Sequence, residues 1–148
     1  MRKAFACLMV LAALVLIVAG CGSKKESGDT DQAVSKATSA VCNGSALTGS
    51  VKLPAGFPQI AEATYTKQST AGPTDIVLGY FNGKLKAAHD AFKRVLQSAA
   101  AYQVTHDELD EHDSEVNWSG QGRTGQVAIK EQCGADAKMY VRITNRPS

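Results

Sequence analysis

The sequence predicts an α+β domain, in which one amphipathic helix packs on one face of an antiparallel sheet of order ββαββββ. Two observations predict it. Apolar residues recur at intervals of three and four over 84–102, which is typical of an amphipathic helix. Strand-like stretches with short Gly- and Asp-rich connections flank this segment, which favours antiparallel neighbours. Because 148 residues suffice for one domain of ordinary size, we expect a single sandwich over residues 42–148.

Before the helix, two stretches alternate as strands do, 63–69 and 75–81, with a turn between them. A further short strand is predicted at 46–53, ended by prolines. Asn82-Gly83 is a hairpin signal in isolation, but the helical period begins directly after it. We therefore expect Asn82 to be the N-cap of the helix.

Four strand-like stretches follow the helix, at 103–109, 115–119, 125–132 and 138–144. Their short connections suit an antiparallel meander. Trp118 is expected in the core, the alternative being an exposed indole that stacks on a sugar. His89 flanks the apolar stripe of the helix, which favours a packing residue with one hydrogen-bond partner over a catalyst.

The N-terminus has the parts of a secretory signal. Arg2 and Lys3 precede seventeen uncharged residues, 4–20, which end in Val18-Ala19-Gly20 and are followed directly by Cys21. This segment resembles the bacterial lipoprotein signal, whose lipobox is an aliphatic residue, two small residues and Cys. The resemblance implies cleavage after residue 20, a lipid on the Cys21 thiol and anchoring at the extracytoplasmic face of the cell membrane. An uncleaved membrane helix is the alternative, although seventeen residues are short for a bilayer core of about 30 Å.

Residues 21–41 are rich in Ser, Gly, Lys, Asp and Thr, and bury too little apolar surface to offset their ordering entropy. We predict a flexible tether behind the lipidated Cys21, the alternative being a short helix over 30–41. The layout of the globular part resembles small α+β domains of uncharacterised actinobacterial lipoproteins. This resemblance implies no activity.

Four cysteines are present, and the signal and the lipobox account for Cys7 and Cys21. An even remainder in an exported protein favours a disulfide between Cys42 and Cys133. Two free thiols or a redox or metal pair are the alternatives, but the sequence has no CxxC motif.

The charge balance argues against nucleic acid as a partner. Lys and Arg total 16 against 14 acidic residues, and removal of Arg2 and Lys3 with the signal would leave equal numbers. A neutral chain without a basic block lacks the face that neutralises phosphates.

The densest polar cluster spans residues 106–115, with two histidines and six carboxylates. In an extended strand, one side would carry the weak candidate ligands for zinc or manganese: His106, Glu108, Asp110 and His112. However, 110–114 resembles a turn, which would scatter these side chains, and charges at an exposed hairpin commonly protect a sheet edge. We therefore expect no metal site and no cofactor.

Residues 120–125 match G-x-G-x-x-G, but a strand rather than a helix is predicted after them, so we interpret them as a hairpin turn. No common catalytic motif is present. The sequence thus predicts a non-catalytic, membrane-anchored binding or accessory module of the cell envelope, with a protein, glycan or lipid as partner. The alternative is a metal-binding protein or metal-dependent enzyme that uses residues 106–115.

Overall fold

The computed structural model describes residues 27–135 and 137–148. The predicted signal and Cys21 lie outside these residues. The described chain forms two helices and six strands, in the order α1 (Ser27–Cys42), β1 (Ala63–Ala71), β2 (Thr74–Asn82), α2 (Leu85–Ser98), β3 (Tyr102–Leu109), β4 (Asp113–Gly120), β5 (Arg123–Ala135) and β6 (Lys138–Pro147). The α+β prediction is confirmed.

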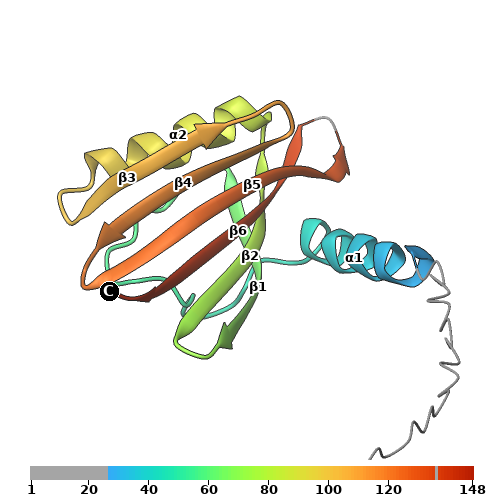
Figure 1. The fold of residues 1–148 in the computed structure, drawn as a ribbon, viewed down its shortest axis with the longest axis horizontal. Helices are drawn as coiled ribbons and strands as arrows, with labels where there is room; N and C mark the ends of the chain where they lie inside the picture. Colours follow the sequence, from blue (N-terminus) through green and yellow to red (C-terminus); the bar gives the residue numbers. More distant parts are fainter. Residues whose placement is uncertain (1–26, 136) are drawn as a thin grey trace, which may run out of the picture.

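All six strands form one antiparallel sheet of order β1-β2-β6-β5-β4-β3 (Figure 1). The predicted meander is present, because β3 to β6 are neighbours in sequence and in the sheet. The last strand returns to the first hairpin, and Ile143 of β6 lies between Val77 of β2 and Val127 of β5. β6 is therefore a central strand of the sheet, paired with β2 on one side and with β5 on the other.

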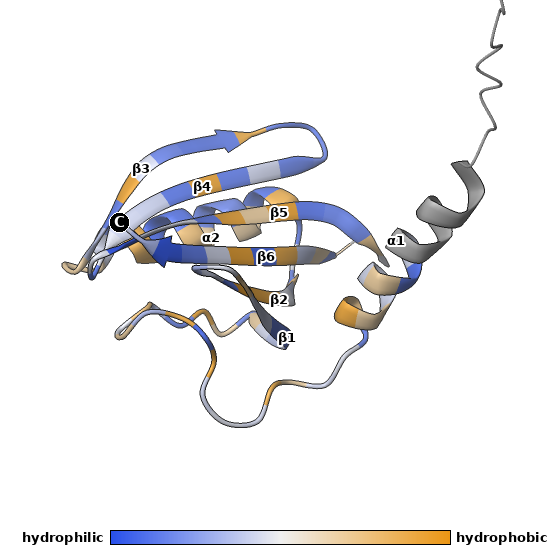
Figure 2. Ribbon diagram, turned by 60° about the horizontal axis from the view of Figure 1, so that its bottom comes forward, coloured by the Kyte–Doolittle hydropathy of each residue, from blue (hydrophilic) through white to orange (hydrophobic). Residues whose placement is uncertain are grey.

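The main core lies between α2 and one face of the sheet. α2 contacts β3, β4 and β5 and runs behind β3 and β4 in Figure 1. Its buried side chains follow the predicted helical stripe: Leu85, Ala88, His89, Ala91, Phe92 and Leu96. Alternate residues of β4, β5 and β6 belong to the same hydrophobic core, and Figure 2 shows the hydrophobic residues concentrated in the middle of β5 and β6.

The irregular segment 43–62 completes the cover of this face. Phe57 lies edge-to-face with both Tyr102 and Trp118, at ring-centroid distances of 5.7 and 5.3 Å. Tyr102 also donates a hydrogen bond from its hydroxyl to the Ala55 carbonyl at 2.9 Å. Trp118 is buried, which confirms its predicted place in the core and leaves no exposed indole for a sugar.

The predicted strand at 46–53 is wrong. Gly49 has a φ of +90°, which interrupts an extended backbone. The segment instead lies beside the edge strand β1, where the Leu47 amide donates to the Tyr65 carbonyl at 2.8 Å. Its side chains Leu47, Val51 and Leu53 pack against the core.

The predicted bounds of the long helix also need correction. α2 ends at Ser98 instead of residue 102, since Tyr102 already begins β3. Asn82 is not the N-cap: it is the last residue of β2, paired with Lys138 of β6. The N-cap is Lys84, whose side chain makes no capping hydrogen bond. The β2–β6 ladder therefore prevails over the local capping preference of Asn82.

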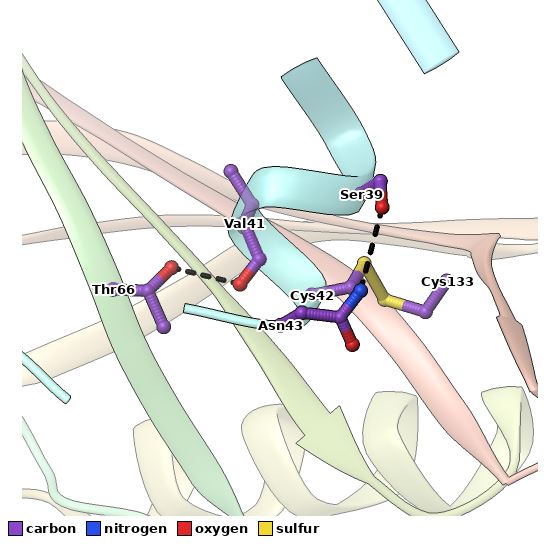
Figure 3. Close-up of a disulfide and its surroundings, with 6 residues drawn as sticks. All are labelled: Ser39, Val41, Cys42, Asn43, Thr66 and Cys133. Atoms are coloured by element: carbon purple, nitrogen blue, oxygen red, sulfur yellow. Dashed lines mark hydrogen bonds between the residues drawn. A yellow bond between two sulfur atoms is a disulfide. The ribbon is translucent and has the colours of Figure 1, made fainter. Parts of the chain in front are cut away.

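Residues 27–42 form helix α1, so the predicted tether is wrong over this range and the alternative helix at 30–41 is the one observed. Tertiary contacts hold the last turn, where Val41 and Cys42 are buried. The Thr66 hydroxyl donates to the Val41 carbonyl at 3.0 Å, and Cys42 is bonded to Cys133 (Figure 3). These contacts offset the ordering entropy that the composition alone does not.

Candidate functional site

The face of the sheet away from α2 carries a polar hollow. Strand alternation sends the apolar residues of β4, β5 and β6 into the core and their polar neighbours to this open face. A hollow of about 480 Å³ lies over these strands, which is within the usual size range of ligand pockets. We call it the open-face groove, and its lining residues are Thr74, Thr105, Asn117, Trp118, Ser119, Thr124, Gly125, Gln126, Arg142, Thr144, Asn145 and Arg146.

Register explains why these side chains meet. Asn117 of β4 pairs with Gln126 of β5, which pairs with Thr144 of β6. The next row toward the β4–β5 turn repeats the pattern with Ser119 and Thr124. Hydroxyl and amide groups from three strands therefore form one continuous polar surface, able to donate and accept hydrogen bonds.

The open-face groove is positively charged. Arg142 and Arg146 line it and are exposed, and no carboxylate is among the lining residues. Neither arginine is within 4 Å of a carboxylate in the described part of the chain. The acid next to the groove is Glu115 of β4, whose carboxylate accepts a hydrogen bond from Gln126 at 2.8 Å.

Arg123 differs from these two arginines. Its guanidinium donates to Asp75 at 3.0 Å and also to the Asn145 side chain. Asn145 in turn donates to the Lys52 carbonyl at 3.1 Å, which ties the irregular segment to the sheet. Arg123 thus has a structural role, because its Nε and Nη2 groups are engaged by Asp75 and Asn145.

A Ser–His–Asp arrangement lies on the other face, beneath α2. The His89 Nδ1 is 2.7 Å from the Ser114 hydroxyl, and its Nε2 is 3.4 Å from the Asp107 carboxylate. However, Ser114 is only 2% exposed and His89 only 4%. A nucleophilic serine must reach its substrate, so these residues form a polar network inside the core.

The network ends at the surface with Lys93, whose ammonium donates to Asp107 at 2.7 Å. This hydrogen bond holds the pKa of the Asp107 carboxyl below its ordinary value. The prediction of His89 as a packing residue is confirmed, with two polar neighbours instead of one. Sequence reasoning missed Ser114, because it lies in the stretch 110–114 that was predicted to be a turn.

The structure does not bring the four candidate metal ligands together. His106 and Glu108 lie on the open face of β3, whereas the chain reverses at 110–112. His112 turns instead to Glu131 of β5, 3.0 Å away, and this contact raises the pKa of its imidazole. Within residues 27–135 and 137–148, no group of three or more metal-ligating side chains converges. The predicted turn is present between β3 and β4, and it separates the side chains that an extended strand would have placed on one side.

The G-x-G-x-x-G segment forms the β4–β5 turn, which confirms the predicted hairpin. Gln121 and Gly122 have φ of +52° and +67°, as a tight hairpin turn requires. No helix follows, because β5 begins at Arg123. The segment therefore lacks the helix N-terminus that a dinucleotide phosphate needs.

The predicted Cys42–Cys133 pair is confirmed, with the two sulfur atoms at bonding distance and the Cα atoms 5.5 Å apart. It joins the last residue of α1 to β5, across 91 positions of sequence. Cys42 is fully buried. The bond therefore fixes the end of α1 to the sheet that carries the open-face groove.

Comparison with protein-family models, curated proteins and solved structures gives no significant match to this chain.

Proposed function

We propose that the protein is a lipid-anchored, extracytoplasmic module of the bacterial cell envelope that binds a glycan in the open-face groove. The observation that carries the binding role is the groove itself, a hollow lined by hydroxyl, amide and guanidinium groups on the sheet face that α2 does not cover. Antiparallel sheets commonly have one face packed on a core and the other face solvated.

The chemistry of the lining favours a glycan over a protein or a lipid. Protein interfaces depend on buried aromatic and aliphatic anchors, and lipid sites on apolar walls. The side chains on the open-face groove are mainly Thr, Ser, Asn, Gln and Arg, while the Trp118 indole is turned into the core. Convergent small polar groups suit a ligand covered with hydroxyl groups.

Binding is favoured over catalysis by the burial of the Ser–His–Asp network. Ser114 and His89 are enclosed beneath α2, on the face opposite the groove. The groove itself holds no carboxylate, histidine or cysteine in its lining, and these are the usual general acids, bases and nucleophiles.

The anchor rests on the lipobox-like Val18-Ala19-Gly20-Cys21. Neither described helix is long and apolar enough to cross a bilayer. If Cys21 carries lipid, α1 begins six positions later and spans about 24 Å at 1.5 Å per residue. The disulfide to β5 would then couple the anchored end of the chain to the orientation of the domain.

Mutation of the groove tests the binding role. Neutral and acidic oligosaccharides are titrated calorimetrically into the mature chain and into a variant with Asn117→Ala and Gln126→Ala. We expect at least a tenfold loss of affinity in this variant, because two amides of the groove are removed. Gln97→Ala, on the exposed side of α2, is the matched control and should bind as the wild type does. Equal affinity in both variants, or no binding of any oligosaccharide, contradicts the proposal.

Mass analysis of membrane-extracted protein tests the anchor. We expect loss of residues 1–20 and added acyl mass, and Cys21→Ser should abolish both. Cys7→Ser removes a thiol within the signal and should leave processing unchanged. A full-length chain without lipid in the membrane would favour the helical anchor.

A further inference from the structure

We infer that the glycan is anionic and that it lies along β6, where Lys138, Arg142 and Arg146 meet its carboxylates. This inference rests on the proposed function and deepens it. Met139, Val141, Ile143 and Asn145 are buried beneath the sheet, so the alternate residues face the open side: Lys138, Tyr140, Arg142, Thr144 and Arg146. We call these five residues the β6 stripe.

The β6 stripe carries three cations and no acid. Successive side chains on one face of a strand are about 6.8 Å apart, so Arg142 and Arg146 are separated by about 14 Å along β6. Such spacing lets a chain-like ligand reach both, whereas a single sugar unit meets one. Lys138 and Arg142 are separated by the same interval, so a positive charge recurs at every second side chain of the stripe.

The three cations of the β6 stripe differ in the contacts that their side chains make. The Lys138 ammonium lies 3.8 Å from the centroid of the Tyr80 ring, a cation–π contact that fixes its position on the open face. Arg142 and Arg146 are exposed and make no ion pair within the described residues. Their guanidinium groups therefore keep the paired N–H donors that suit a carboxylate.

Charge across the open face sets the direction of the ligand. The acidic side chains Glu108, Glu115 and Asp113 lie on the β3–β4 side of the open face. Glu108 is paired with Glu115, and the Asp113 carboxylate is 3.5 Å from the Lys130 ammonium. An anionic chain placed across β4 would meet these carboxylates. Placed along the part of β6 that carries Arg142 and Arg146, it meets these two cations and the hydroxyl and amide groups of the groove, and no carboxylate among the lining residues. Charge complementarity therefore aligns the ligand with β6.

The hollow shape distinguishes such a chain from a membrane surface. Arg142 and Arg146 line a hollow of about 480 Å³ together with short Thr, Ser and Asn side chains. A flat layer of lipid headgroups cannot enter a hollow, whereas a single polysaccharide chain can place hydroxyl groups in it. We therefore assign the groove to a carboxylated polysaccharide segment and use anionic vesicles as the competing probe.

The test is a calorimetric titration of the mature chain with oligogalacturonate, with its neutral methyl ester and with vesicles containing phosphatidylglycerol. We expect oligogalacturonate to bind at least tenfold more tightly than the ester. Its affinity should fall as salt rises from about 50 to 300 mM, because charges at the exposed arginines are screened. R142Q combined with R146Q should lose at least tenfold in affinity for oligogalacturonate.

Arg94→Gln, an exposed arginine on α2 at the opposite face, is the matched control and should bind normally. All variants are checked by thermal unfolding, where exposed substitutions change stability by about 0.5 kcal/mol at most. Equal binding of acid and ester overturns the inference but leaves the glycan-binding role standing. Binding of vesicles alone, or of no probe, overturns both.

Discussion

The Nδ1 of His89 lies 2.7 Å from the hydroxyl of Ser114, and both side chains are enclosed between α2 and the sheet. His89 comes from the helix and Ser114 from β4, 25 positions later in the chain. Each residue satisfies the polar group of the other inside an apolar core, where an unpaired donor or acceptor is costly. The pair therefore joins helix to sheet by a specific polar contact.

Ser114→Ala should lower the free energy of unfolding by about 1–3 kcal/mol, because it leaves a buried His89 nitrogen without its partner. Urea unfolding monitored by circular dichroism measures the loss. Ser119→Ala removes a hydroxyl from the same strand on the open face and should change stability by about 0.5 kcal/mol at most. Equal effects of the two substitutions would contradict the structural role. So would labelling of Ser114 in the native chain by a serine-reactive fluorophosphonate.

The disulfide should stabilise the domain substantially, because Cys42 and Cys133 close a long loop. In the chain-entropy model a loop of about this length contributes up to about 4–5 kcal/mol. The double substitution Cys42→Ala and Cys133→Ala should approach this loss in guanidinium unfolding. Reduced wild-type protein is the comparison and should unfold near the same midpoint. A loss below about 1 kcal/mol would show that the loop is restrained by other contacts.

Lys93 should control the titration of Asp107. In the folded chain its hydrogen bond lowers the pKa of the Asp107 carboxyl, so the native state binds this proton less readily than the unfolded state. The resulting stability is present above the ordinary Asp pKa and is lost as the pH falls through the lowered value. Lys93→Met should raise the pKa of Asp107 and reduce stability at neutral pH relative to acid pH.

Carboxyl-carbon NMR titration checks the effect of Lys93→Met. Lys86→Met is the matched control, because Lys86 lowers the pKa of Asp90 in the same way from another turn of α2. It should raise the pKa of Asp90 and leave Asp107 unchanged. An unshifted Asp107 in Lys93→Met would contradict the assignment.

Gly125 should tolerate no side chain. A Cβ at this position would collide with the Trp118 ring and with the Thr144 carbonyl oxygen. Gly125→Ala should therefore destabilise by about 3 kcal/mol and change the Trp118 fluorescence. Gly122→Ala in the adjacent turn meets open space but requires φ of +67°, so its cost should be about 1 kcal/mol with no fluorescence change. The reverse order of the two losses would contradict this packing.

The local sequence pattern was sufficient to predict those elements whose structure depends on residues close together in the chain. The spacing of Leu85, Phe92 and Leu96 predicted α2 and its buried side, because a helix repeats every 3.6 residues whatever it packs against. Cysteine parity predicted the bond between Cys42 and Cys133. Local pattern failed at Asn82 and at 46–53, where pairing of β2 with β6 and a left-handed Gly49 prevail over local preference.

The sequence by itself determined the order of strands and helix, the core side of α2, the cysteine pair and the turn at residues 120–125. Tertiary structure alone decided that the end of α1 is held to β5 through Cys42 and that His89 contacts Ser114. It also decided that Asn117, Gln126 and Thr144 line one groove. The physical reason is register. Side-chain periodicity is a property of neighbours along the chain, whereas the alignment of β4, β5 and β6 depends on how the whole sheet packs beneath α2.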